Sequence, residues 1–144
     1  MLDRAAILRL IPHQGLMCLL DTASHWDSEH IVCRSCSHHS AENPLRRDGT
    51  LSAVAGVEYG LQAAALHGAL TEGRAEPRRL LAGLRDVVLH AASLDVPGIL
   101  RIAAHVQHRE PAALIYRFEV AAEPGGLLLG GLAVIAGVAG PHLP

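Results

Sequence analysis

Residues 51 to 68 carry a single acidic side chain within an otherwise apolar segment, LSAVAGVEYGLQAAALHG. At the helical period of about 3.6 residues, Glu58 falls on the same face as Val54 and Leu61. The opposite face is apolar as well, so the pattern predicts a helix that is buried nearly all round. A buried carboxylate is costly unless it is paired. Carboxyl groups with shifted pKa values cluster at functional sites, so Glu58 is a candidate functional residue. The alternatives are that it pairs with a buried donor or lies at a subunit boundary.

Size and composition narrow the class of protein. The chain has 144 residues, half of them hydrophobic, which suits one folded domain spanning residues 1–144 and excludes a disordered chain. Its formal net charge is −2, and its basic residues are scattered arginines. No basic patch for nucleic acid or for an anionic membrane is therefore expected.

Two further features bear on the compartment. The only long apolar run, residues 125–140, is short for a membrane span and rich in glycine, so buried strands are expected there instead. Charges interrupt the first residues, which do not resemble a signal peptide. Together with three cysteines, an odd number, these features predict reduced thiols and a cytoplasmic location.

Turn signals and periodicity divide the chain into one long helix and several strands. We expect a helical turn at 5–10, an extended piece at 17–23, a strand at 30–38, a loop at 40–49, the helix to about Leu70, a linker at 71–77, and strands at 79–91, 98–107, 112–122 and 127–138. A buried helix followed by an antiparallel meander indicates an α+β domain with the helix wrapped by a curved sheet. That arrangement is the hotdog fold.

Two motifs resemble those of the hotdog beta-hydroxyacyl-ACP dehydratases: residues 11–13 with 16–21, which read IPH and LMCLLD, and residues 57–62, which read VEYGLQ. The chain is still more similar to the dehydratase-like proteins of aryl-polyene and related pigment clusters. The motifs of that group appear here as Ser37-His38, Asn43-Pro44-Leu45, Gly49-Thr50-Leu51-Ser52, Glu58-Tyr59 and His67-Gly68.

The resemblance implies dehydration of a 3-hydroxyacyl thioester to a trans-2-enoyl thioester, which needs a base and an acid. It assigns the acid to Glu58, with a pKa raised by burial. The catalytic base is harder to assign, because Pro44 occupies the position at which the well-studied dehydratases have a loop histidine. His38 matches the histidine of the closer group and is preferred to His39, since side chains alternate along a strand. The alternative is two solvated histidines at a strand end.

The resemblance also implies supporting roles. His13 is expected to organise the fold or line the substrate pocket, and Asn43 to position substrate or to cap its loop. Gln62, one turn beyond Glu58, is expected to orient the carboxylate. Backbone N–H groups at the helix start, residues 51–54, are candidates to bind the thioester oxygen.

A Cys-x-x-Cys motif, Cys33 to Cys36, raises the possibility of a metal or redox site. On a strand, residues three apart point to opposite faces, so the two sulfurs cannot grip one ion. Cys18 supplies no second ligand pair at zinc-site spacing. We therefore expect no metal and no cofactor.

The expected substrate is a thioester of acyl carrier protein or of coenzyme A, and the expected assembly is a homodimer, a higher homo-oligomer or a heterodimer with another hotdog subunit, with Tyr59 near the subunit boundary. Carrier binding has loose candidates in Arg46, Arg47, Arg78 and Arg79, which also fit plain solvated charges. Two alternative functions remain: an acyl thioesterase that uses Glu58, and a catalytically silent partner subunit.

Overall fold

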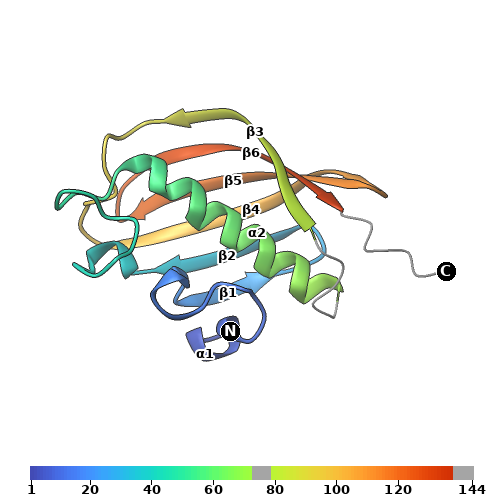
Figure 1. The fold of residues 1–144 in the computed structure, drawn as a ribbon, viewed down its shortest axis with the longest axis horizontal. Coiled ribbons are helices and arrows are strands. Elements are labelled where there is room, and N and C mark those ends of the chain that lie inside the picture. The colour runs from blue at the N-terminus through green and yellow to red at the C-terminus, as the bar shows by residue number, and fades with distance from the viewer. Residues whose placement is uncertain (73–78, 138–144) are drawn as a thin grey trace.

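An antiparallel sheet of six strands forms the framework of the protein. The computed structural model describes residues 1–72 and 79–137. The strands are β1 (Thr22–Trp26), β2 (His30–Ser35), β3 (Arg79–Leu89), β4 (Ile99–Glu110), β5 (Ala113–Glu123) and β6 (Leu127–Gly137). Their order is β1-β2-β4-β5-β6-β3, so the two strands at the sheet edges are β1 and β3 (Figure 1).

The long helix α2 (Gly56–Glu72) lies across one face of this sheet (Figure 1). A short 3₁₀ helix, η3 (Ala53–Ala55), precedes it, and the side chain of Ser52 caps η3 by accepting from the N–H of Val54. Gly60 allows the close approach of helix and sheet, because a Cβ atom there would lie 2.5 Å from Cδ1 of Phe118. A larger residue at this position would force the Phe118 side chain or the helix to move.

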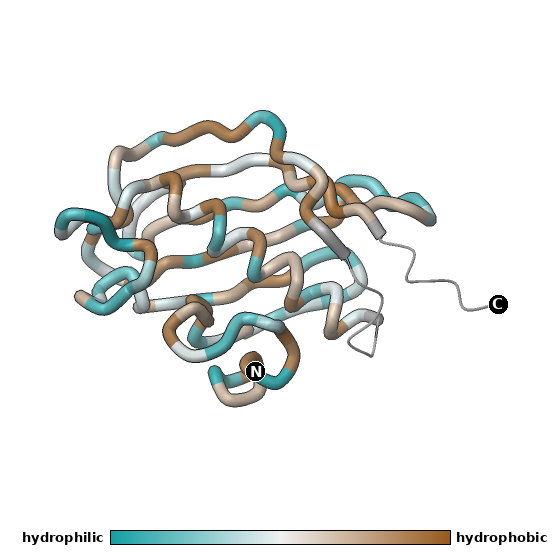
Figure 2. The backbone as a smooth tube through the Cα atoms, in the orientation of Figure 1, coloured by the Kyte–Doolittle hydropathy of each residue, from teal (hydrophilic) through white to brown (hydrophobic). Residues whose placement is uncertain are grey.

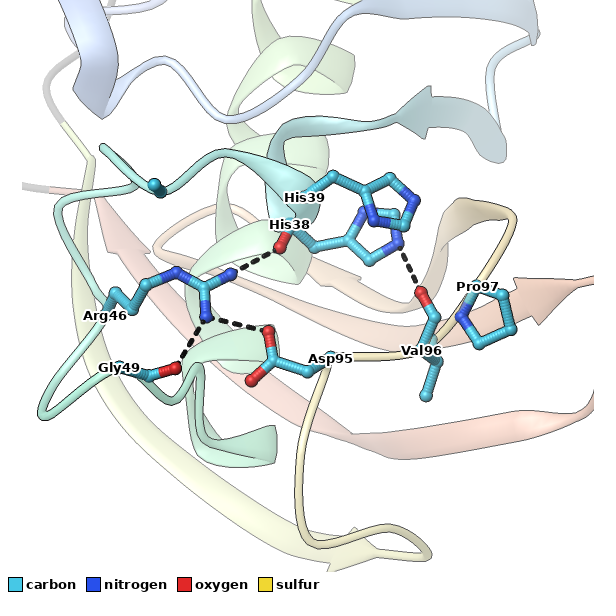
Figure 3. A pocket seen from close by; sticks show the side chains of 8 residues that line it. His38, His39, Arg46, Gly49, Asp95, Val96 and Pro97 are labelled. Carbon is cyan, nitrogen blue, oxygen red and sulfur yellow. Dashed lines mark hydrogen bonds and ion pairs between the residues drawn. The ribbon is translucent and has the colours of Figure 1, made fainter.

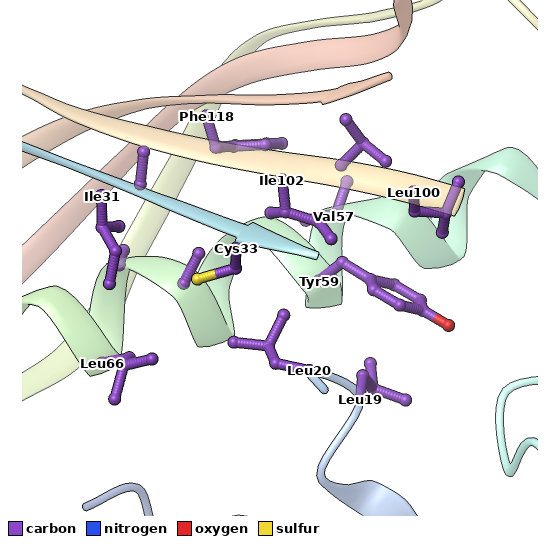
Figure 4. Packing of buried hydrophobic residues seen from close by; sticks show 14 of the residues in the cluster. Leu19, Leu20, Ile31, Cys33, Val57, Tyr59, Leu66, Leu100, Ile102 and Phe118 are labelled. Carbon is purple, nitrogen blue, oxygen red and sulfur yellow. The ribbon is translucent and has the colours of Figure 1, made fainter. Parts of the chain in front are cut away.

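The core fills the space between α2 and the sheet. Figure 4 shows Tyr59 and Leu66 of the helix among side chains of β2, β4 and β5. The largest fully buried side chains are Tyr59, Phe118, Ile7, Leu19, Leu20, Ile31, Leu51, Leu66, Leu94, Leu100, Ile102 and Leu129. Hydrophobic residues thus recur along the strands and the helix, whereas the loop before η3 is hydrophilic (Figure 2).

The N-terminal segment packs beside β1. It contains α1 (Arg4–Leu8), which Asp3 caps, and the 3₁₀ helix η1 (Gly15–Met17). Gln62 of α2 fastens the end of this segment: its Oε1 accepts from the N–H of Leu19 at 2.9 Å, and its Nε2 donates to the carbonyl of Met17 at 2.7 Å. Because Gln62 is fully buried, this anchor is shielded from water.

Most expected elements agree with the observed ones, with shifted ends, but only residues 22 and 23 of the extended piece expected at 17–23 belong to β1. The predicted helix at 51–70 becomes η3 followed by α2, and the four predicted C-terminal strands correspond to β3, β4, β5 and β6. The strand expected at 30–38 ends at Ser35, and a 3₁₀ helix, η2 (Ser37–His39), follows it. Most of the expected linker and the last residue of the final strand lie outside the described residues.

Among the residues described, no helix has both the length and the hydropathy that crossing a membrane requires.

Candidate active site

A surface hollow of about 750 Å³ lies between the loop that follows η2 and the segment that leads into β4 (Figure 3). Its lining residues are His38, His39, Ala41, Arg46, Gly49, Asp95, Val96 and Pro97. Two titratable imidazoles, one guanidinium and one carboxylate therefore meet at a single place, although residues 38 and 95 are far apart in the sequence. Such convergence is typical of a functional site.

His38 is held as a neutral base. Its Nε2 lies 3.2 Å from the carbonyl oxygen of Val96, and since a carbonyl only accepts, Nε2 carries the ring proton. Its Nδ1 is buried and has no hydrogen-bond partner among the described residues, so it keeps a free lone pair. Burial, assisted by the neighbouring His39, lowers the pKa of His38. The imidazole is therefore uncharged at neutral pH and ready to accept a proton at Nδ1.

His39 also lines the hollow, which corrects the argument from strand alternation. The two residues belong to η2 and not to a strand, and their rings lie against each other with centroids 3.8 Å apart. They differ in exposure: His38 is 1% exposed, whereas His39 is exposed and makes a 2.7 Å hydrogen bond with the carbonyl of Gly98. Burial, and not strand alternation, therefore separates the two.

A buried polar network positions η2. The hydroxyl of Tyr59 lies 2.7 Å from Oγ of Ser37, and Asn43 donates from Nδ2 to that hydroxyl at 3.0 Å and to the carbonyl of Ser37 at 3.1 Å. Oδ1 of Asn43 accepts from the N–H of Leu45. All these hydrogen bonds serve the loop, so they favour the capping role for Asn43 over contact with substrate.

The expectation for Tyr59 is wrong, because its side chain is fully buried within the chain and does not face a second subunit. Burial also raises the pKa of its phenol, which therefore stays neutral.

Arg46 and Asp95 close the other side of the hollow, a pairing that sequence analysis missed. Arg46 lies 2.8 Å from Oδ1 of Asp95 and donates to the carbonyl of His38 at 2.6 Å. Oδ2 of Asp95 accepts from the N–H of Leu51, which is the main cause of the lowered pKa of Asp95. No periodicity links Asp95 to Arg46, so no signal in the sequence identified the pair.

These contacts bear on the arginines considered for carrier binding. Arg46 is engaged within the chain, and Arg47 donates to the carbonyls of Pro44 and Arg46. Arg78 and the side chain of Arg79 lie outside the described part of the chain.

The start of the helix does not offer the free N–H groups that we expected. The N–H of Leu51 donates to Asp95, that of Ala53 to the carbonyl of Ala92, and that of Val54 to Oγ of Ser52. The prediction of a thioester-oxygen site at residues 51–54 is therefore wrong for these three donors.

Glu58 is less buried than the apolar helix pattern predicts, because its side chain is 30% exposed. It faces the N-terminal segment, where Nε2 of His13 lies 3.2 Å from its Oε1. The expected burial is wrong since residues 53–72 are not covered on every side. The structure thus brings together His13 and Glu58, two residues that the sequence motifs had placed in separate blocks.

Gln62 serves the same segment. We predicted that Gln62 orients the carboxylate of Glu58. Its described hydrogen bonds go instead to the backbone of Met17 and Leu19. It holds in place the segment that presents His13, so its effect on Glu58 is indirect.

The described residues show no hydrogen bond or ion pair between His38 and Glu58. His38 faces the hollow beside Val96, whereas Glu58 faces His13. One chain therefore displays two candidate half-sites, an imidazole in one and a carboxyl in the other.

The two cysteines of the Cys-x-x-Cys motif do not share a strand, although we expected them to, because β2 ends at Ser35 and Cys36 follows it. Cys33 is fully buried in β2, where burial raises its pKa to about 12, and Cys36 is exposed. A separate group, His25, Asp27 and His30, approaches the spacing of metal ligands at the β1–β2 turn. The carboxylate of Asp27 accepts hydrogen bonds from the N–H groups of residues 29 and 30 and lies against the ring of His30. These contacts stabilise the turn and explain why the three side chains lie close together.

The antiparallel sheet with its long helix defines a protein of the hotdog fold, as the sequence predicted. Residues 5–137 match the family model described as ApeP-like, ApeP dehydratase, and the chain belongs to that family. None of the curated proteins has a sequence that matches this chain.

Solved structures agree on the fold. The dehydratase heterocomplex ApeI:P from Xenorhabdus doucetiae matches with a TM-score of 0.77 at 20% identity, covering 92% of this chain and 90% of that chain. The PaaI protein of the E. coli phenylacetic acid degradation operon matches with a TM-score of 0.61 at 10% identity, over 79% and 80%. A hypothetical thioesterase from Streptococcus pneumoniae TIGR4, solved with coenzyme A, matches with a TM-score of 0.63 at 9% identity, over 81% and 84%.

Proposed function

We propose that this protein dehydrates 3-hydroxyacyl thioesters to trans-2-enoyl thioesters, with His38 as the base and Glu58 as the acid. Acyl carrier protein is the proposed carrier, coenzyme A the alternative, and the cytoplasm the proposed location. Membership of the ApeP-like dehydratase family supports the reaction class.

The observation that carries the proposal is the state of His38. A buried imidazole is prepared to take one proton when its Nε2 is bonded to the Val96 carbonyl and its Nδ1 has no partner in the described part of the chain. An exposed structural histidine would have neither the lowered pKa nor the fixed tautomer. His38 therefore fits the abstraction of an acidic C–H proton better than a role in folding alone.

The proposed reaction balances with no added reagent. Nδ1 of His38 removes a proton from C2 of the acyl chain, and the electron pair forms the C2–C3 double bond. The C3–O bond breaks as Glu58 gives its proton to the departing hydroxyl, which leaves as water. Proton return from His38 to the carboxylate of Glu58 restores the site.

The separation of the half-sites supports an assembly of two hotdog subunits. In such an assembly, His38 of one protomer acts with Glu58 of the other. Either a second copy or a different hotdog dehydratase supplies the second subunit. The similar ApeI:P structure is a dehydratase heterocomplex.

The test is mass spectrometry of a 3-hydroxyacyl carrier protein incubated with the protein alone and with a co-expressed second hotdog dehydratase. We expect loss of one water, and a decrease in rate of at least about 100-fold for Glu58→Gln and for His38→Ala. His108→Ala and Glu110→Gln are matched controls, because these residues form a surface pair away from the hollow.

Other products would change the conclusion. Free carrier protein in place of the enoyl product would establish a thioesterase. Activity that needs the second subunit and survives both substitutions would establish a silent partner, and the proposed roles of His38 and Glu58 would be rejected.

A further inference from the structure

The contact between His13 and Glu58 suggests how the acid keeps its proton. A solvent-accessible carboxyl ordinarily loses its proton near pH 4.3. Glu58, at 30% exposed, is not enclosed by its own chain, and a carboxylate cannot protonate a leaving hydroxyl. A second group must therefore hold a proton within reach of Glu58 at neutral pH.

We propose that His13 and Glu58 act as one proton-donating unit, in which the imidazole stores the proton that Glu58 passes to the leaving hydroxyl. This inference rests on the proposed dehydration. The distance of 3.2 Å between Nε2 and Oε1 is within the range for direct proton transfer. A carboxylate at this distance favours the charged form of an imidazole.

The surroundings of His13 favour this role. Gln14 donates to the carbonyls of Leu8 and Ile11, which fixes the backbone beside His13. Gln62, four residues after Glu58 in α2, fastens the end of the same segment. The helix that carries the carboxyl therefore also positions the imidazole.

The charged groups on neighbouring elements are engaged elsewhere. The guanidinium of Arg4 donates to the carbonyl of Gly15, and the carboxylate of Asp21 accepts from the N–H of Cys36. Burial raises the pKa of the Cys18 thiol, which stays neutral. Within the described chain, His13 is the only group that forms an ion-pair contact with Glu58.

Before the reaction, a protonated His13 faces the carboxylate of Glu58. The proton on Nε2 moves to Oε1, and Glu58 passes a proton to the leaving hydroxyl, so a neutral imidazole and a carboxylate remain. The proton collected by His38 returns to Glu58 and passes from there to Nε2 of His13, which restores the site. Each cycle therefore neither consumes nor releases a net proton.

The pH–rate profile of His13→Gln tests the proposal. Glutamine retains a side-chain donor for Glu58 but stores no titratable proton. We expect a decrease in kcat of at least about tenfold at pH 7.5, with activity returning as the pH falls toward 5, where the lone carboxyl regains its proton. The lowered pKa of His38 keeps the base neutral over part of that range.

His108→Gln is the matched control, because Nε2 of His108 lies 2.7 Å from Oε1 of Glu110 in an exposed pair. Its profile should follow the wild type. A profile for His13→Gln that also follows the wild type would overturn the inference while leaving the dehydratase intact. So would a uniform loss of rate at every pH, since that result indicates positioning alone.

An NMR titration of the His13 ring separates this inference from the proposed function, because it needs no substrate. We expect the imidazole to hold its proton to higher pH in the wild type than in Glu58→Gln. Equal titration curves would overturn the coupled pair even if the enzyme dehydrates its substrate. A shifted curve with no turnover would reject the dehydration and keep the coupling.

Discussion

The two halves of α2 each bury a tyrosine-based hydrogen-bond network, but the networks support different parts of the molecule. Near the start of the helix, the Tyr59 hydroxyl contacts Ser37 and Asn43, which hold the turn carrying His38. Near its end, His67 lies 2.7 Å from the hydroxyl of Tyr116, and its Nε2 donates to the carbonyl of Asp27 at 2.8 Å.

The comparison shows that burial and hydrogen bonding alone do not identify a functional residue. Tyr59 and Tyr116 are the two tyrosines of the chain, and both are buried. The first fixes a loop that lines the hollow, and the second helps to fasten α2 to the β1–β2 turn. The two networks differ in the segment that they hold in place, the turn carrying His38 in one case and the β1–β2 turn in the other. Only the tertiary structure specifies which segment that is.

The largest expected contrast is between two glycines of α2. Gly60→Ala would place a Cβ atom 2.5 Å from Cδ1 and 2.9 Å from Cβ of Phe118, whose side chain is fully buried. We expect a loss of about 1–3 kcal/mol in the free energy of unfolding. Gly68→Ala meets no atom within 4 Å and should gain up to about 1 kcal/mol, because glycine is unfavourable within a helix. Urea denaturation measures both; a tolerated Gly60→Ala would contradict the close packing on β5.

The next contrast is between the two tyrosines. Each change to phenylalanine removes one hydroxyl and should cost about 1 kcal/mol of stability. Only Tyr59→Phe loosens the turn that carries His38, so we expect kcat to decrease about tenfold or more with little change in KM. Tyr116→Phe should keep the wild-type kcat. Steady-state kinetics below the unfolding transition checks this, and equal kcat values would show that Tyr59 has no greater role than Tyr116.

The smallest contrast concerns pH. Burial is the main cause of the lowered pKa values of His38 and His67, so both side chains bind protons less readily when folded than when unfolded. Their effect is absent above the ordinary histidine pKa of about 6.5 and grows as the pH falls below it, where the unfolded chain takes up protons first. Stability should therefore decrease from pH 7.5 to 5.5. His67→Gln should flatten that slope, whereas the surface change His108→Gln should not, as urea titrations at both pH values would reveal.

Much of the fold was predictable because the relevant signals are local. The apolar segment around Glu58 predicted the central helix, and turn residues such as Pro97, Pro111 and Pro124 separated the predicted strands. The motif resemblance indicated the dehydratase family that the comparisons confirmed. The end of β2 was missed since residues 36–38 have strand-like composition, although the chain turns there into η2.

The candidate site was only partly predictable. Sequence motifs named His38 and Glu58 but implied that Glu58 is buried and that Gln62 contacts it; the structure places His13 against Glu58 instead. The Arg46–Asp95 pair spans 49 positions, and no regular spacing reports such a contact. Polar contacts between distant loops depend on how the loops meet.

By itself, the sequence determined the succession of one long helix and an antiparallel meander, because hydrophobic periodicity and turn chemistry act over a few residues. It also determined which side chains can exchange protons. Only the tertiary structure decided that the ring of His38 is buried with its Nε2 on the Val96 carbonyl and that His13 meets Glu58. The reason is physical: burial and contact depend on which segments pack together, and those segments are far apart along the chain.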